Sequence, residues 1–107
     1  MKKIAILLTD LFEDEEYLRP KTAFENDGHK IINVGIKKAE NNTAYGKRKN
    51  TPVKLDKSLE NLSVNEFDAL FIPGGYSPDK LRTNKKAVNF VKQFVISEKP
   101  VLLICHA

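Results

Sequence analysis

The sequence has very few of the residues on which several classes of protein depend. A single cysteine, Cys105, excludes an internal disulfide framework, and the two histidines lie too far apart for a zinc-binding motif. No apolar run approaches the roughly 18 residues that cross a bilayer, and the apolar stretch near the N-terminus meets Asp10 before any signal-peptide cleavage pattern. We therefore expect a cytoplasmic protein that needs no metal or other cofactor and has no membrane partner.

Charge is distributed unevenly along the 107 residues, and this matters more than the net charge of +4. Residues 10–19 hold five acidic side chains against one arginine, whereas residues 37–57 hold seven lysines and arginines against two acids. Such a basic stretch could bind nucleic acid, yet it contains one aromatic residue, Tyr45, and matches no nucleic-acid-binding motif. The sequence therefore favours a solvated hairpin over a nucleic-acid partner, and solvated carboxylates for all but one of the five acids.

Short apolar runs alternate with stretches of helical spacing, and the length suits a single domain of residues 1–107. The predicted strands are 4–8, 29–34, 68–72 and 101–104, and the predicted helices are 13–27, one that begins near Ser77, and 85–97. Strands that alternate with helices in this way form parallel sheets joined by right-handed crossovers. The predicted fold class is therefore α/β.

Local signals refine this prediction. Pro20 lacks the amide hydrogen that a helix interior uses, so we expect a kink there or a separate first turn. Ser77 followed by Pro78 predicts a helix start with a capping side chain and a ring suited to the first helical position. The polar segment in the middle of the chain predicts a short hairpin with strands at 43–45 and 53–55.

Three chemically different groups follow three of the predicted strands. The acidic residues of 10–16 follow the first strand, Gly74 and Gly75 follow the third, and Cys105 with His106 follows the last. Ligands of parallel α/β sheets bind beyond the carboxyl ends of the strands, so we expect these groups to meet at one edge. This convergence predicts a functional site there.

Each of these residues also has a purely structural interpretation. Cys105 is either a small buried hydrophobe or a nucleophile at a strand-to-helix turn, where its thiolate form would be favoured. Gly74 and Gly75 form either a tight turn alone or an oxyanion hole through their backbone amides. His106 is either a base or orienting group for the thiol, or takes no part in the chemistry, and His29 is expected to be structural.

Four segments at matching spacing together resemble the ThiJ/PfpI superfamily, and more narrowly its PfpI-type branch of intracellular cysteine peptidases and general stress proteins. They are DLFEDEEYLRP from Asp10 to Pro20, ALFIPGG ending at Gly75, SPDKLR ending at Arg82, and PVLLICHA at 100–107. The resemblance runs in order along the whole chain. The combination is specific, whereas any one segment alone would carry little weight.

The resemblance implies a flavodoxin-like (class I glutamine amidotransferase-like) fold, with a mostly parallel sheet and helices on both faces. It also implies that Cys105 is the nucleophile and that Glu16 is the carboxyl partner of the thiol. The backbone amides of Gly75, beside Gly74, and of His106 would bind the oxyanion. In the PfpI-type branch His106 is in addition a catalytic member, and a glutamate from a neighbouring subunit completes the triad. The turn Gly-Gly-Tyr-Ser-Pro here offers no equivalent of that glutamate.

Superfamily members form dimers or hexamers, so self-association is the expected partnership. They also continue beyond the Cys-His pair, whereas this sequence stops at Ala107, so we expect the C-terminal part of the domain to be missing and the chain alone to be poorly active. The expected function is a cysteine-nucleophile hydrolase acting on a peptide or a small carbonyl compound (peptidase, glyoxalase or deglycase), with Cys105 attacking the carbonyl and Glu16 assisting. The alternative is a non-enzymatic stress-response, chaperone or redox-sensing protein in which Cys105 is oxidised.

Overall fold

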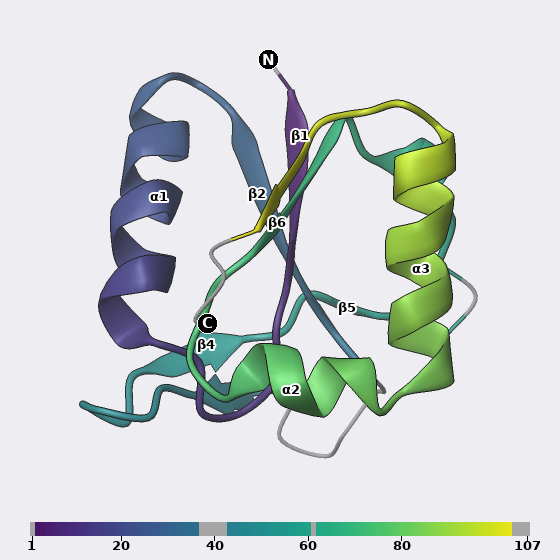
Figure 1. The fold of residues 1–107 in the computed structure, drawn as a ribbon. Coiled ribbons are helices and arrows are strands. Elements are labelled where there is room, and N and C mark those ends of the chain that lie inside the picture. Colours follow the sequence, from purple (N-terminus) through teal and green to yellow (C-terminus); the bar gives the residue numbers. More distant parts are fainter. Residues whose placement is uncertain (1, 37–42, 61, 104–107) are drawn as a thin grey trace.

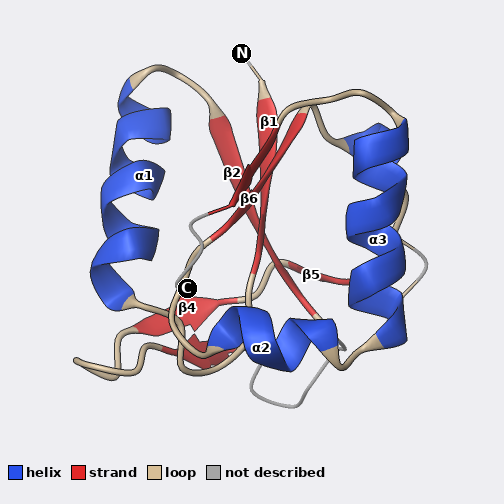
Figure 2. Ribbon diagram, in the orientation of Figure 1, coloured by secondary structure: helices blue, strands red, loops and turns tan. Residues whose placement is uncertain are grey.

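A computed structural model of the protein describes residues 2–36, 43–60 and 62–103. Within them, the central sheet contains β1 (Lys3–Leu7), β2 (Lys30–Gly35), β5 (Lys57–Ser58), β6 (Ala69–Ile72) and β7 (Val101–Leu103), and the helices are α1 (Asp14–Asn26), α2 (Ser77–Arg82) and α3 (Lys85–Ile96). The strands are parallel and lie in the order β5-β2-β1-β6-β7. Figure 1 shows α1 on one face of the sheet and α3 on the other, and Figure 2 shows the same layers by element type. The predicted α/β fold with a mostly parallel sheet is confirmed.

β1 lies at the centre of the sheet, and the apolar run that follows its first residue, Lys3, explains why. Successive side chains of a strand point to opposite faces. Ile4 and Ile6 therefore enter the hydrophobic core that includes residues of α1, whereas Ala5 and Leu7 enter the core that includes residues of α3. A strand that serves two cores needs an apolar residue at every buried position, as this one has from Ile4 to Leu7.

α1 continues as one helix through Pro20, so the chain has no separate first turn there. What Pro20 removes is the backbone hydrogen bond that would otherwise reach the carbonyl of Glu16, four residues earlier. Further along the buried face, the hydroxyl of Tyr17 donates a hydrogen bond of 3.0 Å to Oδ1 of Asn33 in β2. This bond ties the helix to the sheet beneath it.

Two helix starts use their polar side chains differently. Ser77 does not cap α2 as predicted but is its first residue, and its hydroxyl accepts the backbone N–H of Thr9 at 3.0 Å. The hydroxyl is occupied by the chain that leaves β1, so it is not turned to its own helix. Asn84, in contrast, caps α3, because its Oδ1 accepts the N–H of Ala87 at 3.0 Å.

α3 buries a narrow stripe of its surface. Ala87, Phe90 and Phe94 are buried, whereas the apolar side chains of Val88 and Val95 are 48% and 61% exposed. Residues three and four apart lie above one another on a helix, so 87, 90 and 94 define one line and 88 and 95 fall beside it. The two phenylalanine rings pack against each other with centroids 5.5 Å apart and fill the space on that line.

The predicted hairpin is present in the middle of the chain. β3 (Thr43–Tyr45) and β4 (Pro52–Lys54) pair antiparallel, with β4 one residue earlier than expected. In Figure 1 this hairpin lies at the end of the sheet where β1 and β6 end and where α1 begins. A short 3-10 helix, η1 (Val64–Glu66), precedes β6. No helix in the described part of the chain is long and apolar enough to cross a membrane.

Candidate functional site

The segments that follow β1 and β6 meet at the carboxyl edge of the sheet, as the sequence predicts. The N–H of Glu13 donates to the carbonyl of Gly74 at 2.9 Å, and the N–H of Tyr76 donates to the carbonyl of Leu11 at 2.9 Å. Phe12 and Gly75 face each other between these two bonds as an antiparallel bridge. The third expected group, Cys105 with His106, lies outside the described residues; β7 is described to Leu103.

Gly75 does more than form a tight turn, because two backbone segments approach each other closely at its position. Its φ of +96° lies in the region that favours glycine, and a Cβ added there would lie 2.6 Å from the backbone nitrogen of Glu13. Its own amide takes part in neither of the two bonds that flank it, because it belongs to a non-hydrogen-bonded pair. Gly74 uses its carbonyl to fix the turn. The close approach of two backbones therefore requires a glycine at position 75.

Glu16 is the third residue of α1 and carries an unusual oxygen atom. Its Oε1 is buried and has no hydrogen-bond partner among the described residues. A buried oxygen acceptor without a donor costs free energy, and native structures contain few of them. Within the described residues, this oxygen is therefore the clearest candidate for a hydrogen bond to a substrate or to a residue outside the described ranges.

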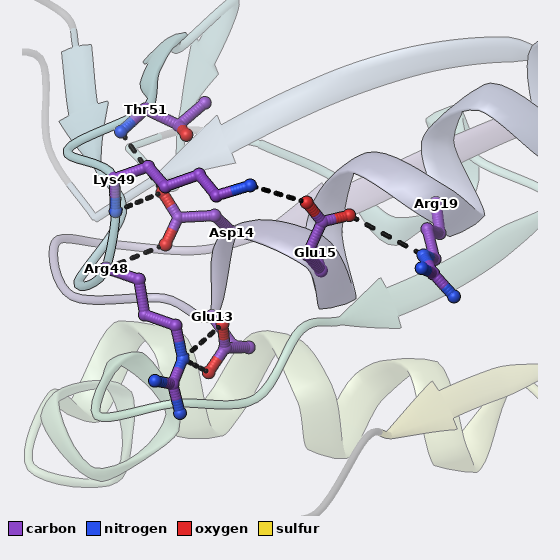
Figure 3. Close-up of polar contacts among 7 residues, drawn as sticks. All are labelled: Glu13, Asp14, Glu15, Arg19, Arg48, Lys49 and Thr51. Atoms are coloured by element: carbon purple, nitrogen blue, oxygen red, sulfur yellow. Dashed lines mark hydrogen bonds and ion pairs between the residues drawn. The ribbon is translucent and has the colours of Figure 1, made fainter.

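Only part of the acidic run around Glu16 is solvated as predicted, because Asp10 is exposed and Glu15 is partly exposed, whereas two other acids are buried. Asp14 is completely buried and Glu13 is 7% exposed, so the solvated interpretation is wrong for both. Asp10 also has a partner, because its Oδ1 accepts the N–H of Tyr45 at 2.9 Å. The reason is the hairpin of β3 and β4, whose turn lies on the beginning of α1 (Figure 3).

Asp14 receives the backbone of that turn. Its carboxylate accepts N–H groups from Arg48 at 2.9 Å, Thr51 at 3.1 Å and Lys49 at 3.3 Å. Burial acts to raise the pKa of Asp14, but the hydrogen bonds from Thr51 and Arg48 outweigh it and hold the pKa far below its ordinary value. Gly46 completes the fit, because a Cβ there would lie 2.0 Å from Oδ2 of Asp14.

Glu13 binds the side chains of the same turn. The Nε of Arg48 lies 2.8 and 3.0 Å from its two carboxylate oxygens, and the Nζ of Lys47 lies 3.6 Å away. The hydrogen bond from Arg48 lowers the pKa of Glu13 despite burial. In return Glu13 raises the pKa of Arg48, with smaller contributions from the charges of Asp14 and Glu16. Arg48 is thus close enough to Glu16 to interact with it electrostatically.

The sequence analysis did not predict that the basic turn between β3 and β4 contacts this edge of the sheet. The stretch was expected to be a solvated hairpin, yet Lys47 is largely buried, with its Nζ 4.9 Å from the centre of the Tyr76 ring. The signal that could have found it is the pair of opposite charge blocks, five acids at 10–19 and seven basic residues at 37–57. Within the described ranges, no group of three or more His, Cys, Asp or Glu side chains is placed to hold a metal ion.

Comparisons with known proteins agree with this geometry. The family model described as the DJ-1/PfpI family matches residues 2–107. The chain is 47% identical over 105 residues to "Protein/nucleic acid deglycase 2" of Escherichia coli and 45% identical over 105 residues to "General stress protein 18" of Bacillus subtilis. Each match covers 98% of this chain and 60% of the relative, so the chain spans about 60% of the length of these two relatives.

A solved structure gives the same result for the fold. A two-domain protein of Anabaena variabilis, with a DJ-1/ThiJ/PfpI-like and a ferritin-like domain, superposes with a TM-score of 0.91 and 34% sequence identity. The match covers 99% of this chain and 30% of that one. The flavodoxin-like architecture is therefore confirmed.

Proposed function

Because this chain belongs to the DJ-1/PfpI family, we propose that the protein is a cysteine-dependent deglycase, which removes carbonyl adducts from amines. Cys105 is the proposed nucleophile, and Glu16 is the carboxyl group that assists it. The observation that carries the proposal is the buried Oε1 of Glu16, which has no partner among the described residues and could hydrogen-bond a thiol or a reacting atom. The choice of a deglycase over a peptidase follows the name of the relative from Escherichia coli.

The proposed reaction uses the groups at the carboxyl edge in sequence. The carbinolamine adduct first collapses: Glu16 carries the proton of its hydroxyl group to the nitrogen, the carbon–nitrogen bond breaks, and the amine leaves. The thiolate of Cys105 adds to the aldehyde carbon so released, and the oxyanion that forms accepts hydrogen bonds from the amides of Gly75 and His106. Glu16 then moves the proton on this carbon to the neighbouring carbonyl carbon, which gives a thioester, and water hydrolyses the thioester to a hydroxy acid and the free thiol. The amide of Gly75, which its neighbouring bridge leaves unused, supports this assignment.

Turnover of a methylglyoxal-modified lysine peptide tests the proposal. We expect Cys105→Ser to abolish the release of free amine and Glu16→Gln to slow it by about 100-fold or more, the range typical of a lost proton-transfer group. Glu25→Gln is the matched control, because Glu25 lies on the same helix with its side chain 46% exposed and pairs with Lys21. Full turnover by the Glu16→Gln protein would contradict the role of Glu16.

A second candidate function is a redox-responsive stress protein in which peroxide oxidises Cys105 to a sulfinate held by the carboxyl group of Glu16. The similarity to "General stress protein 18" favours this alternative. It predicts a peroxide-dependent mass increase on Cys105 in a protein that shows no turnover of the adduct. Turnover that depends on Cys105 would exclude it as the sole function.

We also propose that the protein self-associates. Leu102 and Leu103 on β7 are 52% and 55% exposed, which is unusual for large apolar side chains in a strand. Sedimentation velocity on the sample used for turnover measures the oligomeric state, and a monomer at all concentrations would contradict the proposal.

A further inference from the structure

The first turn of α1 lacks the usual support at both of its ends. Glu13 stands at the N-cap position but makes no capping hydrogen bond with its side chain. Four residues after Glu16, Pro20 has no N–H to donate to the Glu16 carbonyl. The first helical bond runs from the N–H of Tyr17 to the carbonyl of Glu13 at 3.1 Å. A helix start that lacks both a side-chain cap and the backbone hydrogen bond from position 20 to Glu16 is expected to fray unless another element holds it.

The turn of the β3–β4 hairpin supplies that support through Asp14. Three backbone N–H groups of the turn converge on this one carboxylate, and Gly46 provides the space for it. Figure 3 shows the turn residues arranged around Asp14 at the beginning of the helix. Hydrogen bonds to an ionised acceptor in a buried place are among the stronger ones in proteins. The position of the first helical turn is therefore set by contacts with a segment more than 30 residues away.

Glu16 depends on that turn for its own position. Its Oε1 makes no hydrogen bond with the described residues, so no such bond fixes this oxygen in place. Glu16 lies two residues after Asp14, within the same turn, so a shift of the helix start displaces both. We propose that Asp14 is a positioning residue, which with the hairpin turn fixes the start of α1 and thereby holds the carboxyl group of Glu16 in its working position. This inference rests on the proposed function of Glu16.

Asp14→Asn is the variant that separates positioning from other effects. The amide has the same shape, but its NH2 group must face at least one of the three backbone N–H donors that the carboxylate accepts. Thr51→Ala is a milder second variant, because it removes the Thr51 hydroxyl, which contributes to the lowered pKa of Asp14, and keeps the carboxylate. Glu25→Gln near the other end of α1 is the control, since Glu25 pairs with Lys21 of the same helix and not with the hairpin turn.

The readouts are adduct turnover and the pH dependence of the rate at which iodoacetamide alkylates Cys105, both measured where circular dichroism shows a folded protein. We expect Asp14→Asn to lower turnover by about 10- to 100-fold, as small misplacements of catalytic groups do. Asp14→Asn should also shift the pH dependence of the alkylation rate (the alkylation profile) in the same direction as Glu16→Gln does. Thr51→Ala should give a smaller change of the same kind, and Glu25→Gln none.

The double variant Asp14→Asn/Glu16→Gln gives the decisive comparison. If Asp14 acts through Glu16, the double variant is no slower than Glu16→Gln alone, because a displaced carboxyl group and an absent one are equivalent. Losses that simply add, or an unchanged alkylation profile in Asp14→Asn and Thr51→Ala, would show that Asp14 serves stability alone. If Glu16→Gln itself leaves turnover and profile unchanged, it is the proposed function that fails.

Discussion

At the scale of single residues, Asn33 joins three parts of the molecule beneath the candidate site. Its Oδ1 accepts the hydroxyl of Tyr17, its Nδ2 donates to the carbonyl of Lys54 at 3.1 Å, and its backbone N–H donates to Oδ2 of Asp56 at 2.8 Å. Burial raises the pKa of Tyr17 to about 12, so its hydroxyl keeps the proton that it donates throughout the neutral range. The bond is therefore available at any pH where the protein works.

Removal of the Tyr17 hydroxyl should lower the stability of the fold. In Tyr17→Phe the ring packing is kept, but Oδ1 of Asn33 loses its donor in a buried place. We expect the free energy of unfolding to fall by about 1–3 kcal/mol, the typical penalty for a buried polar group left unpaired. Urea unfolding measures it. Tyr45→Phe, at a ring 39% exposed on β3, is the control and should change stability by no more than about 0.5 kcal/mol. Equal effects of the two variants would contradict this account.

Sequence reasoning at this scale found some of the candidate residues and not others. Gly75 could be singled out because it lies in the glycine pair shortly after an apolar strand, and the structure shows that its position requires glycine. Glu16 was selected by family resemblance, since five acids in one short stretch are chemically alike. Asp14 and Gly46 could not be found, because their burial depends on contact between segments 34 residues apart in the chain. No local pattern encodes such a contact.

At the scale of elements, α3 is the helix that the sequence predicts best, and its start has a clear chemical cause. Asn84 adopts an extended backbone and its side chain caps the N–H of Ala87. Asn84→Ala should lower the free energy of unfolding by about 1 kcal/mol, the usual value of an N-cap. Asn89→Ala, on the exposed face of the same helix, should cause no loss. Thermal and urea unfolding of both variants give the comparison, and a loss confined to Asn89→Ala would be the opposite of what we expect.

The elements show why local signals succeed in some places and fail in others. The strands and α3 were predicted because continuous apolar runs and helical spacing survive in any tertiary context. The assignment of Ser77 as a cap failed because its hydroxyl is bonded to Thr9, a residue 68 positions earlier. β5 has two residues and was not predicted at all, since its pairing with the end of β2 leaves no apolar pattern. Tertiary contacts thus decided the outcome in both failures.

At the scale of the whole molecule, parts of the two charge blocks meet at one edge, where Lys47 and Arg48 pair with Glu13 and Lys49 pairs with Glu15. Glu13 and Asp14 both have a pKa below the ordinary values of 4.5 and 3.8. A carboxyl group whose pKa is lower in the folded state than in the unfolded state stabilises the fold above its unfolded pKa. This stabilisation is lost as the pH falls through the range between the two values.

Stability should therefore depend on acid pH through these groups. We expect the free energy of unfolding to change little between about pH 6 and 8 and to decrease steadily below about pH 5. Asp14→Asn should flatten this decrease, because it removes the group held by three backbone N–H donors. Urea unfolding at a series of pH values, at low and high salt, provides the test. An unaltered slope in Asp14→Asn would show that other carboxyl groups cause the acid sensitivity.

The central place of β1 has a consequence for synthesis on the ribosome. This strand leaves the exit tunnel before both of its neighbours in the sheet, because its partner residues in β2 lie 27 positions later and those in β6 lie 65 positions later. A nascent chain can close β1, α1 and β2 into a local unit, but one edge of the most apolar strand must wait for Ala69–Ile72 to emerge. Translation pauses before that point would prolong the exposure of that edge.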